Sequence, residues 1–259
     1  MTTSLITGAT AGIGAAFARR LAADGHDLVL VARDAVRLGE SAAELREQHG
    51  VAVEVLQADL ASDGGITAVE NRLRESGLPP VDVLVNNAGF GHRGRYLEVP
   101  LSDELRMLTV HCEAVLRLTS AAAQGMRERG RGSVVNVASV AAFMPRGTYA
   151  ASKAWVVRFT QGAALDLRGS GVRFLALCPG FVRTEFHQRA GMQPDRLPAW
   201  AWLDADKVVA AGLRDLARGR VVSVPDARYK VAVGLARHLP PGLFGAVSTG
   251  AGRKYDPKT

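Results

Sequence analysis

A tyrosine and a lysine stand four residues apart at Tyr149 and Lys153, in the run Tyr-Ala-Ala-Ser-Lys. In a helix this spacing puts both side chains on one face. A nearby ammonium favours phenolate, so we expect Lys153 to lower the pKa of Tyr149 and let it exchange a proton with a carbonyl or hydroxyl oxygen. Ser139, which follows a β-branched run, could donate a hydrogen bond to that oxygen. Such a pair alone is more often an exposed helix pair, so its meaning depends on its neighbours.

A glycine-rich segment, Thr7–Gly14, reads Thr-Gly-Ala-Thr-Ala-Gly-Ile-Gly between a predicted strand and a predicted helix. Glycines let the backbone turn tightly and approach a pyrophosphate, and the free amides of the next helix attract an anion. Glycine-rich turns also occur for packing alone, but the strand–helix context favours dinucleotide binding. The candidate contacts are Gly8, Thr10, Gly12, Ile13 and Gly14.

The second predicted strand ends at Ala32 and is followed by Arg33. Folds of this kind that prefer NAD place an acid at this strand end to bind the ribose 2′-hydroxyl. A guanidinium there would instead pair with a 2′-phosphate. Arg33 therefore favours NADP(H) as the cofactor, with a solvated surface arginine as the alternative.

Short aliphatic runs alternate with helix-length segments along the chain. This pattern predicts an α/β fold, a doubly wound parallel sheet of the Rossmann type with a ligand crevice at the carboxyl ends of the strands. The expected strands are Ser4–Thr7, Asp27–Ala32, Ala52–Leu56, Val83–Asn86, Ser133–Ala138 and Val172–Cys178, and the helices lie near 12–24, 34–49, 62–76, 101–128 and 148–168. Further on, Lys207–Arg218 and Ala227–Leu239 look helical and Val221–Val224 strand-like.

No linker divides the chain, so we expect a single catalytic domain over 1–240 and a tail over 241–259. A proline- and tryptophan-containing stretch at about 185–205 predicts a short substrate flap. The two cysteines have neither disulfide nor metal spacing, so no metal is expected. With no signal peptide and no transmembrane run visible, we expect a cytoplasmic protein.

The formal charge of the 259 residues is +7, but it is distributed unevenly. Residues 1–206 hold 22 basic and 22 acidic side chains, whereas 207–259 hold 10 basic and 3 acidic ones. A neutral body argues against nucleic acid as a partner. The basic end has three interpretations: a solvated face, which we favour, a peripheral contact of 207–250 with an anionic membrane, or docking of an acidic carrier protein.

The motifs, taken together and in order, resemble those of the short-chain dehydrogenase/reductase superfamily. The resemblance covers about residues 3–190 and continues more loosely to about 235. It implies hydride transfer between a nicotinamide cofactor and an alcohol or carbonyl substrate, in a homodimer or homotetramer built on the helices at 101–128 and 148–168. The matching segments are Thr7–Gly14, Asp59-Leu60, Asn86-Asn87-Ala88-Gly89, Ser139, Tyr149–Lys153 and Pro179–Thr184.

The resemblance also implies roles for single residues. Tyr149 would be the general acid/base, Lys153 would hold the nicotinamide ribose and tune Tyr149, and Ser139 would orient the substrate oxygen. Asp59 would contact adenine and Asn86 the cofactor half that faces the sheet, with turn chemistry at strand ends as their alternative. The remaining cofactor contacts would be Leu60, Ala88, Gly89, Pro179, Gly180, Val182 and Thr184.

Two features depart from the family pattern. His111 stands where the family usually has an asparagine that supports a water-mediated proton relay to the lysine. Histidine can preserve the relay, change its pH dependence or fill space in a helix. The ten-residue spacing from Ser139 to Tyr149 is also short, so the loop Val140–Thr148 must be trimmed, which reshapes one wall of the substrate pocket.

Aromatic and sulfur-containing side chains are expected in loops near the strand ends. Grouped around a nicotinamide, they would form an apolar pocket for a hydrophobic ketone or secondary alcohol, unless they only cover a sheet edge or a subunit contact. These residues are Phe90, His92, Phe143, Met144, Phe186, Met192, Trp200 and Trp202. The alternative to an enzyme is a non-catalytic NADP(H)-binding sensor or scaffold module, against which the intact Ser139, Tyr149 and Lys153 argue.

Overall fold

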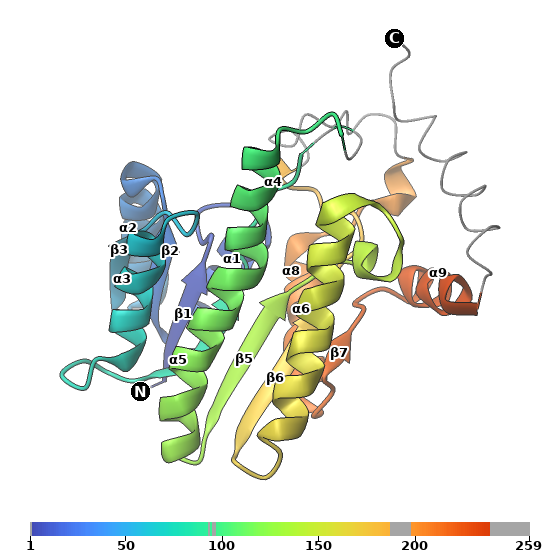
Figure 1. Cartoon of the computed structure of the whole chain (residues 1–259). Helices are drawn as coiled ribbons and strands as arrows, with labels where there is room; N and C mark the ends of the chain where they lie inside the picture. Colours follow the sequence, from blue (N-terminus) through green and yellow to red (C-terminus); the bar gives the residue numbers. More distant parts are fainter. Residues whose placement is uncertain (1, 93, 95–96, 187–197, 239–259) are drawn as a thin grey trace.

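The computed structural model describes residues 2–92, 94, 97–186 and 198–238. Its centre is a seven-stranded parallel sheet in the order β3-β2-β1-β4-β5-β6-β7 (Figure 1). Strands β2 and β3 are added on one side of β1, and the chain then crosses back so that β4 to β7 are added on the other side, as in a doubly wound fold. The strands are β1 (Thr3–Thr7), β2 (Asp27–Ala32), β3 (Val53–Gln57), β4 (Val81–Asn86), β5 (Gly132–Val137), β6 (Val172–Leu177) and β7 (Val222–Ser223).

Helices cover both faces of the sheet, which explains why the strands are apolar throughout. On one face Phe17 and Leu38 join the core, and on the other Ile66 and Leu118 do. The first face carries α1 (Gly12–Ala23), α2 (Ala35–His49) and α8 (Ala205–Ala217), and the second α3 (Asp63–Arg74), α5 (Ala114–Glu128) and α6 (Gly147–Asp166). The Rossmann-type fold predicted from the sequence is thereby confirmed.

The helix expected over 101–128 has three parts. α4 (Leu101–Leu108) and α5 are joined by η1 (Thr109–Glu113), one turn of wider π-helix that contains His111. Such turns within α-helices are frequent at functional sites. The sequence pattern does not distinguish such a π-turn from continuous α-helix, because one inserted residue barely disturbs the helical spacing of the apolar side chains.

A buried polar network ties the central strands to the helices on one face. The amide nitrogen of Asn86 on β4 donates to Asn136 Oδ1 on β5 at 2.9 Å and to Thr119 Oγ1 on α5 at 3.0 Å. The amide of Asn136 donates to Thr160 Oγ1 on α6 at 3.0 Å. Because each buried donor must find an acceptor, this network fixes which helices lie beside β4 and β5.

Most of the predicted flap at about 185–205 lies outside the described residues, so the flap stays a prediction. A short 3-10 turn, η4 (Ala199–Ala201), leads to a parallel bridge between Val182 and Leu203. Then follow α8, β7 and α9 (Ala227–His238). The expected tail 241–259 and Met192 lie outside the described residues.

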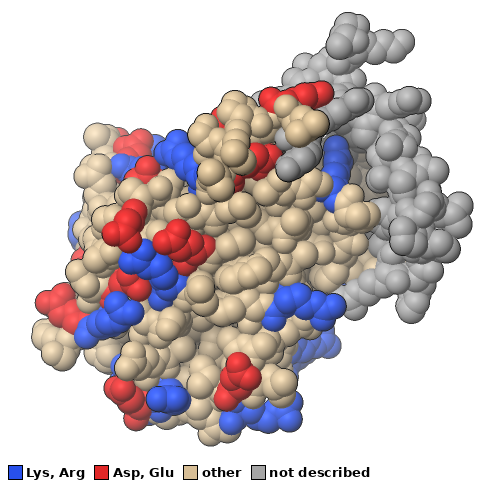
Figure 2. Space-filling model, viewed as in Figure 1, with Lys and Arg blue, Asp and Glu red and all other residues tan. Residues whose placement is uncertain are grey.

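Charged side chains are unevenly distributed over the surface. On the face in Figure 2 many of them gather at the left, and the centre of the face, over α5 and α6, carries few charged side chains. Arg117 pairs with Glu70, Asp63 and Glu113, which joins α5 to α3. In the part of the chain that the structure covers, no helix has the length and apolar character needed to cross a membrane.

Candidate active site

The glycine segment forms the turn between β1 and α1 that its sequence predicts. Gly8 and Gly12 have φ of 65° and 55°, the left-handed region in which a side chain is strained. A Cβ on Gly14 would lie 2.1 Å from the carbonyl oxygen of Gly8, so only glycine permits this close packing of the turn onto the helix. The backbone is therefore arranged as a concave cradle at the carboxyl end of β1.

Thr7 and Asn87 hold this turn against the end of β4, a role that the sequence analysis did not assign. The Asn87 side-chain amide donates to the carbonyl oxygens of Thr7 and Gly8, at 2.9 and 3.1 Å. Thr7 Oγ1 accepts from the backbone amides of Asn87 and Ala88, both at 3.0 Å. The second asparagine of the Asn-Asn-Ala-Gly run is the signal that could have suggested it, since an amide both donates and accepts.

The residues around the turn fit a phosphate-bearing dinucleotide. The first turn of α1 has no side-chain cap and no acidic residue, whereas Asp34 caps α2 and Asp204 caps α8. Its free amides face the concave turn, where they would hold a pyrophosphate. The Arg33 side chain is exposed and has no hydrogen-bond or ion-pair partner among the described residues, so it is free for a further anionic group.

Tyr149 and Lys153 lie on one face of α6, with the Lys153 Nζ 5.9 Å from the centre of the Tyr149 ring. The ammonium donates to the Val137 carbonyl at the end of β5, at 3.0 Å, and is 6% exposed. Ser139 begins η2 (Val140–Phe143) and forms a hydrogen bond with Tyr149. The short loop therefore still brings Ser139 to the tyrosine.

The expected lowering of the Tyr149 pKa is wrong for this structure. Burial of the phenol raises its pKa to about 12, and only the hydrogen bond from Ser139 opposes the shift. Burial also lowers the pKa of Lys153 to about 8. Removal of water disfavours both charged forms, and the expectation considered only the attraction between them. Tyr149 is thus protonated at neutral pH.

His111 is 1% exposed, and its hydrogen bonds define its protonation state. Nε2 accepts from the backbone amide of Phe90 at 3.2 Å, so it carries no proton. Nδ1 lies 2.9 Å from Ser152 Oγ, whose own hydrogen goes to the Tyr149 carbonyl at 2.7 Å, so Nδ1 is the donor. The pKa of His111 is held well below its usual value by burial and then by Lys153. The imidazole is therefore neutral.

Gly89 leaves space for the close approach of His111 and Lys153. A Cβ at this position would lie 2.9 Å from His111 Nε2 and 3.6 Å from Lys153 Nζ. The three residues come from the loop after β4, from η1 and from α6. The structure therefore brings His111 into the site, packed against the same glycine as Lys153, and not into a remote part of the core.

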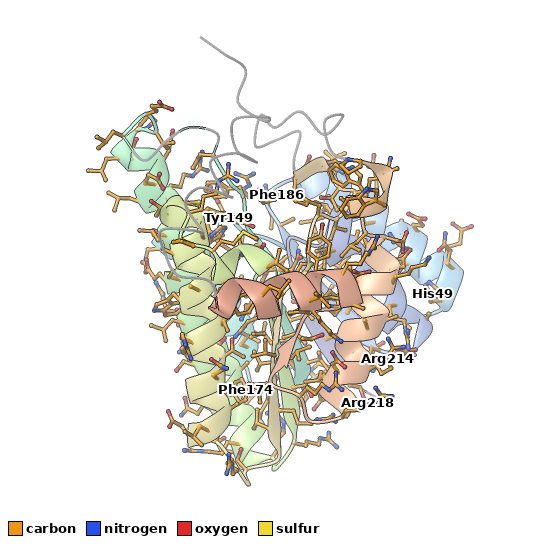
Figure 3. The ribbon with its side chains drawn as sticks, turned by 90° about the vertical axis from the view of Figure 1, so that its right-hand side faces the viewer. His49, Tyr149, Phe174, Phe186, Arg214 and Arg218 are labelled. Carbon is orange, nitrogen blue, oxygen red and sulfur yellow. The ribbon has the colours of Figure 1, made fainter. Side chains whose placement is uncertain are left out.

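Two rings contact the Tyr149 ring: Phe186 from the segment after β6, at 6.0 Å, and His111 from η1, at 5.6 Å. Phe90, from the loop after β4, lies 6.1 Å from His111 and 5.2 Å from His92. Figure 3 shows Tyr149 and Phe186 together at one end of the molecule. Phe186 is thus the apolar ring that packs directly on Tyr149.

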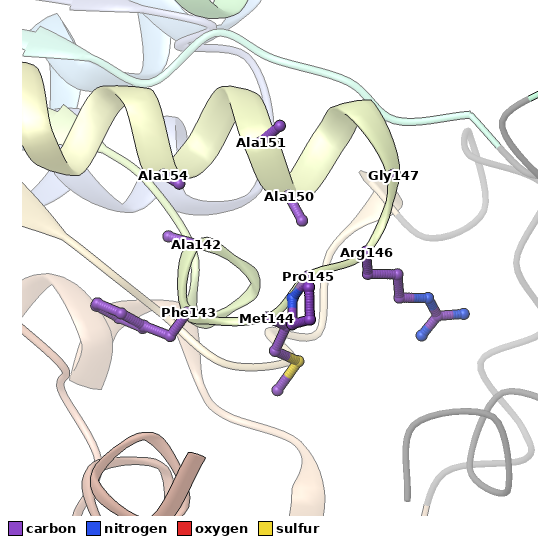
Figure 4. A pocket seen from close by; sticks show the side chains of 9 residues that line it. All are labelled: Ala142, Phe143, Met144, Pro145, Arg146, Gly147, Ala150, Ala151 and Ala154. Atoms are coloured by element: carbon purple, nitrogen blue, oxygen red, sulfur yellow. The ribbon is translucent and has the colours of Figure 1, made fainter. Parts of the chain in front are cut away.

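Two of the residues expected in this pocket, Phe143 and Met144, lie elsewhere. Phe143 and Met144 line a separate hollow of about 520 Å³ between η2 and α6 (Figure 4). The hollow meets α6 at Ala150, Ala151 and Ala154, the opposite helix face from Tyr149. The expected single pocket is wrong because strand-end proximity does not determine which side of α6 a loop follows.

Trp200 and Trp202 likewise lie apart from the phenol. Trp200 is 68% exposed, and Trp202 contacts the Phe181 ring and the Arg183 guanidinium. Both tryptophans belong to the chain between β6 and α8.

The acidic and amide residues expected at the cofactor also have structural contacts. Asp59 accepts from the backbone amide of Ala61 and pairs with Arg106 at 3.2 Å, which is turn chemistry plus an ion pair. Asn86 is 4% exposed in the network described above, and its Oδ1 has no partner among the described residues. Leu60 is buried in the core.

The segment after β6 reaches the glycine turn. The carbonyl of Pro179 accepts from Val140, and Gly180 lies so close to Tyr229 of α9 that a Cβ would overlap its ring. Val182 is buried, while the Thr184 methyl lies 2.8 Å from where a Cβ on Gly12 would be. Ile13 packs on the adjacent core. Thr184 therefore brings the segment after β6 against the glycine turn, and the cofactor contacts assigned to both segments stay predictions.

A doubly wound sheet with this Tyr-Lys-Ser site defines the class of dehydrogenases and reductases that use an acid/base tyrosine. The family model for short chain dehydrogenases matches residues 2–195. The chain belongs to this family, within the short-chain dehydrogenase/reductase superfamily, and is an oxidoreductase.

Individual relatives agree with this assignment. Sulfoacetaldehyde reductase 2 of Chromohalobacter salexigens is 38% identical over 187 residues, 70% of this chain and 73% of that protein. A short-chain dehydrogenase from Sphingobium yanoikuyae, solved in complex with NADPH, is 40% identical with a TM-score of 0.83, covering 95% of this chain and 96% of that one. The bulky-bulky ketone specific alcohol dehydrogenase from Comamonas testosteroni is 35% identical with a TM-score of 0.79, covering 95% and 94%.

Proposed function

We propose that the protein transfers hydride between NADP(H) and a hydrophobic ketone or secondary alcohol, with Tyr149 as general acid/base. The observation that carries this proposal is the placement of Tyr149, Ser139 and Lys153 at the same sheet edge as the glycine turn and the uncapped N-terminus of α1. This placement supports a shared site for a dinucleotide and a proton donor, which a non-catalytic binding module would not need.

A nicotinamide cofactor held at the glycine turn would supply the hydride that reduces the carbonyl carbon. Ser139 donates a hydrogen bond to the substrate oxygen, and Tyr149 transfers its phenolic proton to that oxygen, so that a C–H and an O–H bond form as the C=O double bond becomes single. With a pKa near 12, Tyr149 is protonated beforehand. The Lys153 ammonium, present below about pH 8, stabilises the phenolate that remains.

Two observations support NADP(H) and an apolar substrate. Arg33 is exposed and unpaired within the described residues at the end of β2, where a 2′-phosphate would be recognised. The Phe186 ring packs on Tyr149, and Phe90 packs on His111, which also contacts the Tyr149 ring. The Sphingobium relative solved with NADPH and the Comamonas enzyme named for bulky ketones agree with this choice.

The test is oxidation of NADPH by the purified protein against a panel of hydrophobic ketones. Tyr149→Phe should lower kcat by about 10²- to 10⁴-fold, because the proton donor is removed, while the Kd for NADPH stays close to that of the wild type. NADPH fluorescence measures that Kd. Retention of most activity by Tyr149→Phe would exclude the acid/base role. NADPH binding without turnover of any ketone would favour the non-catalytic alternative.

A further inference from the structure

Three consecutive residues that follow β6, Thr184-Glu185-Phe186, each contact a different part of the site. Thr184 touches the glycine turn at Gly12, and Phe186 packs on Tyr149. Glu185, between them, pairs with Arg37 of α2. We call Thr184–Phe186 the bridging segment, because it spans from the cofactor side of the crevice to the catalytic phenol.

The Arg37–Glu185 pair joins the bridging segment to α2. Arg37 Nη1 and Nη2 donate to the two carboxylate oxygens at 3.0 and 2.8 Å, a two-pronged geometry that fixes the direction of both side chains. Arg37 Nη2 also donates to the carbonyl of Thr10 in the glycine turn, at 3.2 Å. One guanidinium therefore links α2, the glycine turn and the bridging segment.

The position of Arg37 is set by its helix. Its backbone amide donates to the Asp34 side chain that caps α2, at 3.1 Å, one turn after Arg33. The side chains of Arg37 and Glu185 are 36% and 43% exposed, so solvent and salt weaken their attraction. The two-pronged ion pair thus orients the bridging segment, and because both side chains are partly exposed the pair can break at a small cost in free energy.

We propose that the Arg37–Glu185 ion pair is a clasp that holds the bridging segment over the dinucleotide crevice and limits the rate of cofactor exchange. This rests on the proposed function. Thr184 lies against Gly12, so a dinucleotide bound at the glycine turn would lie beside the bridging segment. Movement of this segment away from α2 breaks the Arg37–Glu185 ion pair, which is one of the contacts of Glu185.

The test measures dissociation of NADPH and of NADH by stopped-flow fluorescence, with excess oxidised cofactor as competitor. Glu185→Gln keeps the shape of the side chain and removes its charge. In Glu185→Gln the rate of cofactor dissociation should rise about two- to tenfold. The factor should be the same for NADPH and NADH, because the ion pair does not recognise the 2′-phosphate. The dissociation rate of the wild type should also rise with ionic strength, because salt screens the ion pair. The rate of Glu185→Gln should depend on ionic strength much less.

Two variants make the result specific. Asp206→Asn breaks another exposed arginine–carboxylate pair, with Arg19 at 2.7 Å, far from the crevice, and should leave both rates unchanged. Arg33→Ala should weaken NADPH but not NADH, which separates phosphate recognition from the clasp.

Unchanged dissociation rates in Glu185→Gln would overturn the clasp. So would an effect on NADPH alone, because Glu185 would then only compete with the 2′-phosphate for Arg37. Failure of the wild type to bind either cofactor would contradict the proposed function itself, and this outcome is seen before any variant is measured.

Discussion

His111 occupies the site as a neutral imidazole with one defined tautomer. Phe90 donates to Nε2 and Nδ1 donates to Ser152, which in turn donates to the Tyr149 carbonyl. The chain of bonds therefore ends on the backbone of the catalytic tyrosine. Because the pKa of His111 is well below its usual 6.5, the ring does not change charge near neutrality. Lys153, whose pKa is lowered to about 8, is the site residue that changes charge near neutral pH.

This arrangement predicts the pH dependence of ketone reduction. Lys153 is charged below about pH 8 and loses its proton above it, so kcat/KM should be level on the acid side of that value and fall on the alkaline side. Tyr149 contributes nothing to this fall, since its pKa near 12 keeps it protonated. His111→Asn should remain a working enzyme with the same alkaline fall, because an amide can also donate and accept.

The measurement is kcat/KM against pH for the wild type and His111→Asn, with His111→Leu as the variant that removes both hydrogen bonds. Leucine leaves the Phe90 amide and the Ser152 hydroxyl without their partner, so His111→Leu should lose more activity than His111→Asn. An inflection near pH 6.5 that disappears in His111→Asn would show that the histidine itself titrates during catalysis.

At the level of elements, the sequence predicted the fold well because each apolar run could only be a buried strand. The runs at Asp27–Ala32 and Val172–Cys178 match β2 and β6 within one residue. The glycine turn was predictable as well, since its conformation depends on residues next to one another. The π-turn at Thr109–Glu113 was not, because its signal lies in hydrogen bonds and not in side-chain type.

Contacts between distant segments limited the prediction of the site. Tyr149 and Lys153 were found because one helix holds both, whereas Arg37 and Glu185 are 148 positions apart and no local pattern relates them. The Tyr149 pKa was misjudged for a similar reason, because burial depends on the whole fold. Phe143 and Met144 were placed in the wrong pocket because the side of α6 on which a loop lies is also a tertiary property.

The buried polar network that joins β4 and β5 to α5 and α6 gives a prediction about the stability of the fold. Thr160 Oγ1 accepts from Asn136 and donates to the Val156 carbonyl, and the side chain is fully buried. Thr160→Val keeps the shape and removes the acceptor, so the Asn136 amide loses its partner. The free energy of unfolding should fall by about 1–3 kcal/mol, measured by urea denaturation.

Thr109→Val is the matched control for that experiment. The Thr109 hydroxyl is partly exposed and makes no side-chain hydrogen bond with the described residues, so this variant should change stability by less than about 0.5 kcal/mol. Equal effects of the two substitutions would mean that the Asn136–Thr160 bond adds nothing to stability beyond side-chain shape.

At the scale of the whole molecule, both acidic side chains that the structure describes beyond residue 206 are paired with arginines. Arg220 pairs with Asp215 and Arg228 with Asp226, at 3.1 and 2.9 Å. Lys207, Arg214, Arg218 and Lys230 are exposed and have no ion-pair partner among the described residues. Arg214 and Arg218 lie toward the end of α8, away from Tyr149 (Figure 3). A solvated face is the interpretation that these pairs favour, and the membrane and carrier-protein alternatives stay predictions for 207–250.

The sparsely charged face over α5 and α6 is where we expect subunits to meet. Figure 2 shows few charged side chains there, and Leu116 and Leu165 are 45% and 62% exposed. Exposed apolar area of this kind is stabilised by burial against a second copy, and a two-fold axis would place each helix pair on its equivalent. We therefore predict a homodimer or homotetramer in solution, measured by light scattering after size exclusion.

Leu116→Glu combined with Leu165→Glu should shift the protein toward a monomer, because each interface would bury the new carboxylates of both subunits without partners. Val36→Glu provides the control, since Val36 is 70% exposed on α2 at the opposite face of the sheet and should leave the mass unchanged. A wild-type monomer at micromolar concentration, or an oligomer that the double variant leaves intact, would place the subunit contact elsewhere or remove it. Because the catalytic face of α6 points away from this surface, a monomeric double variant should keep most of its NADPH binding.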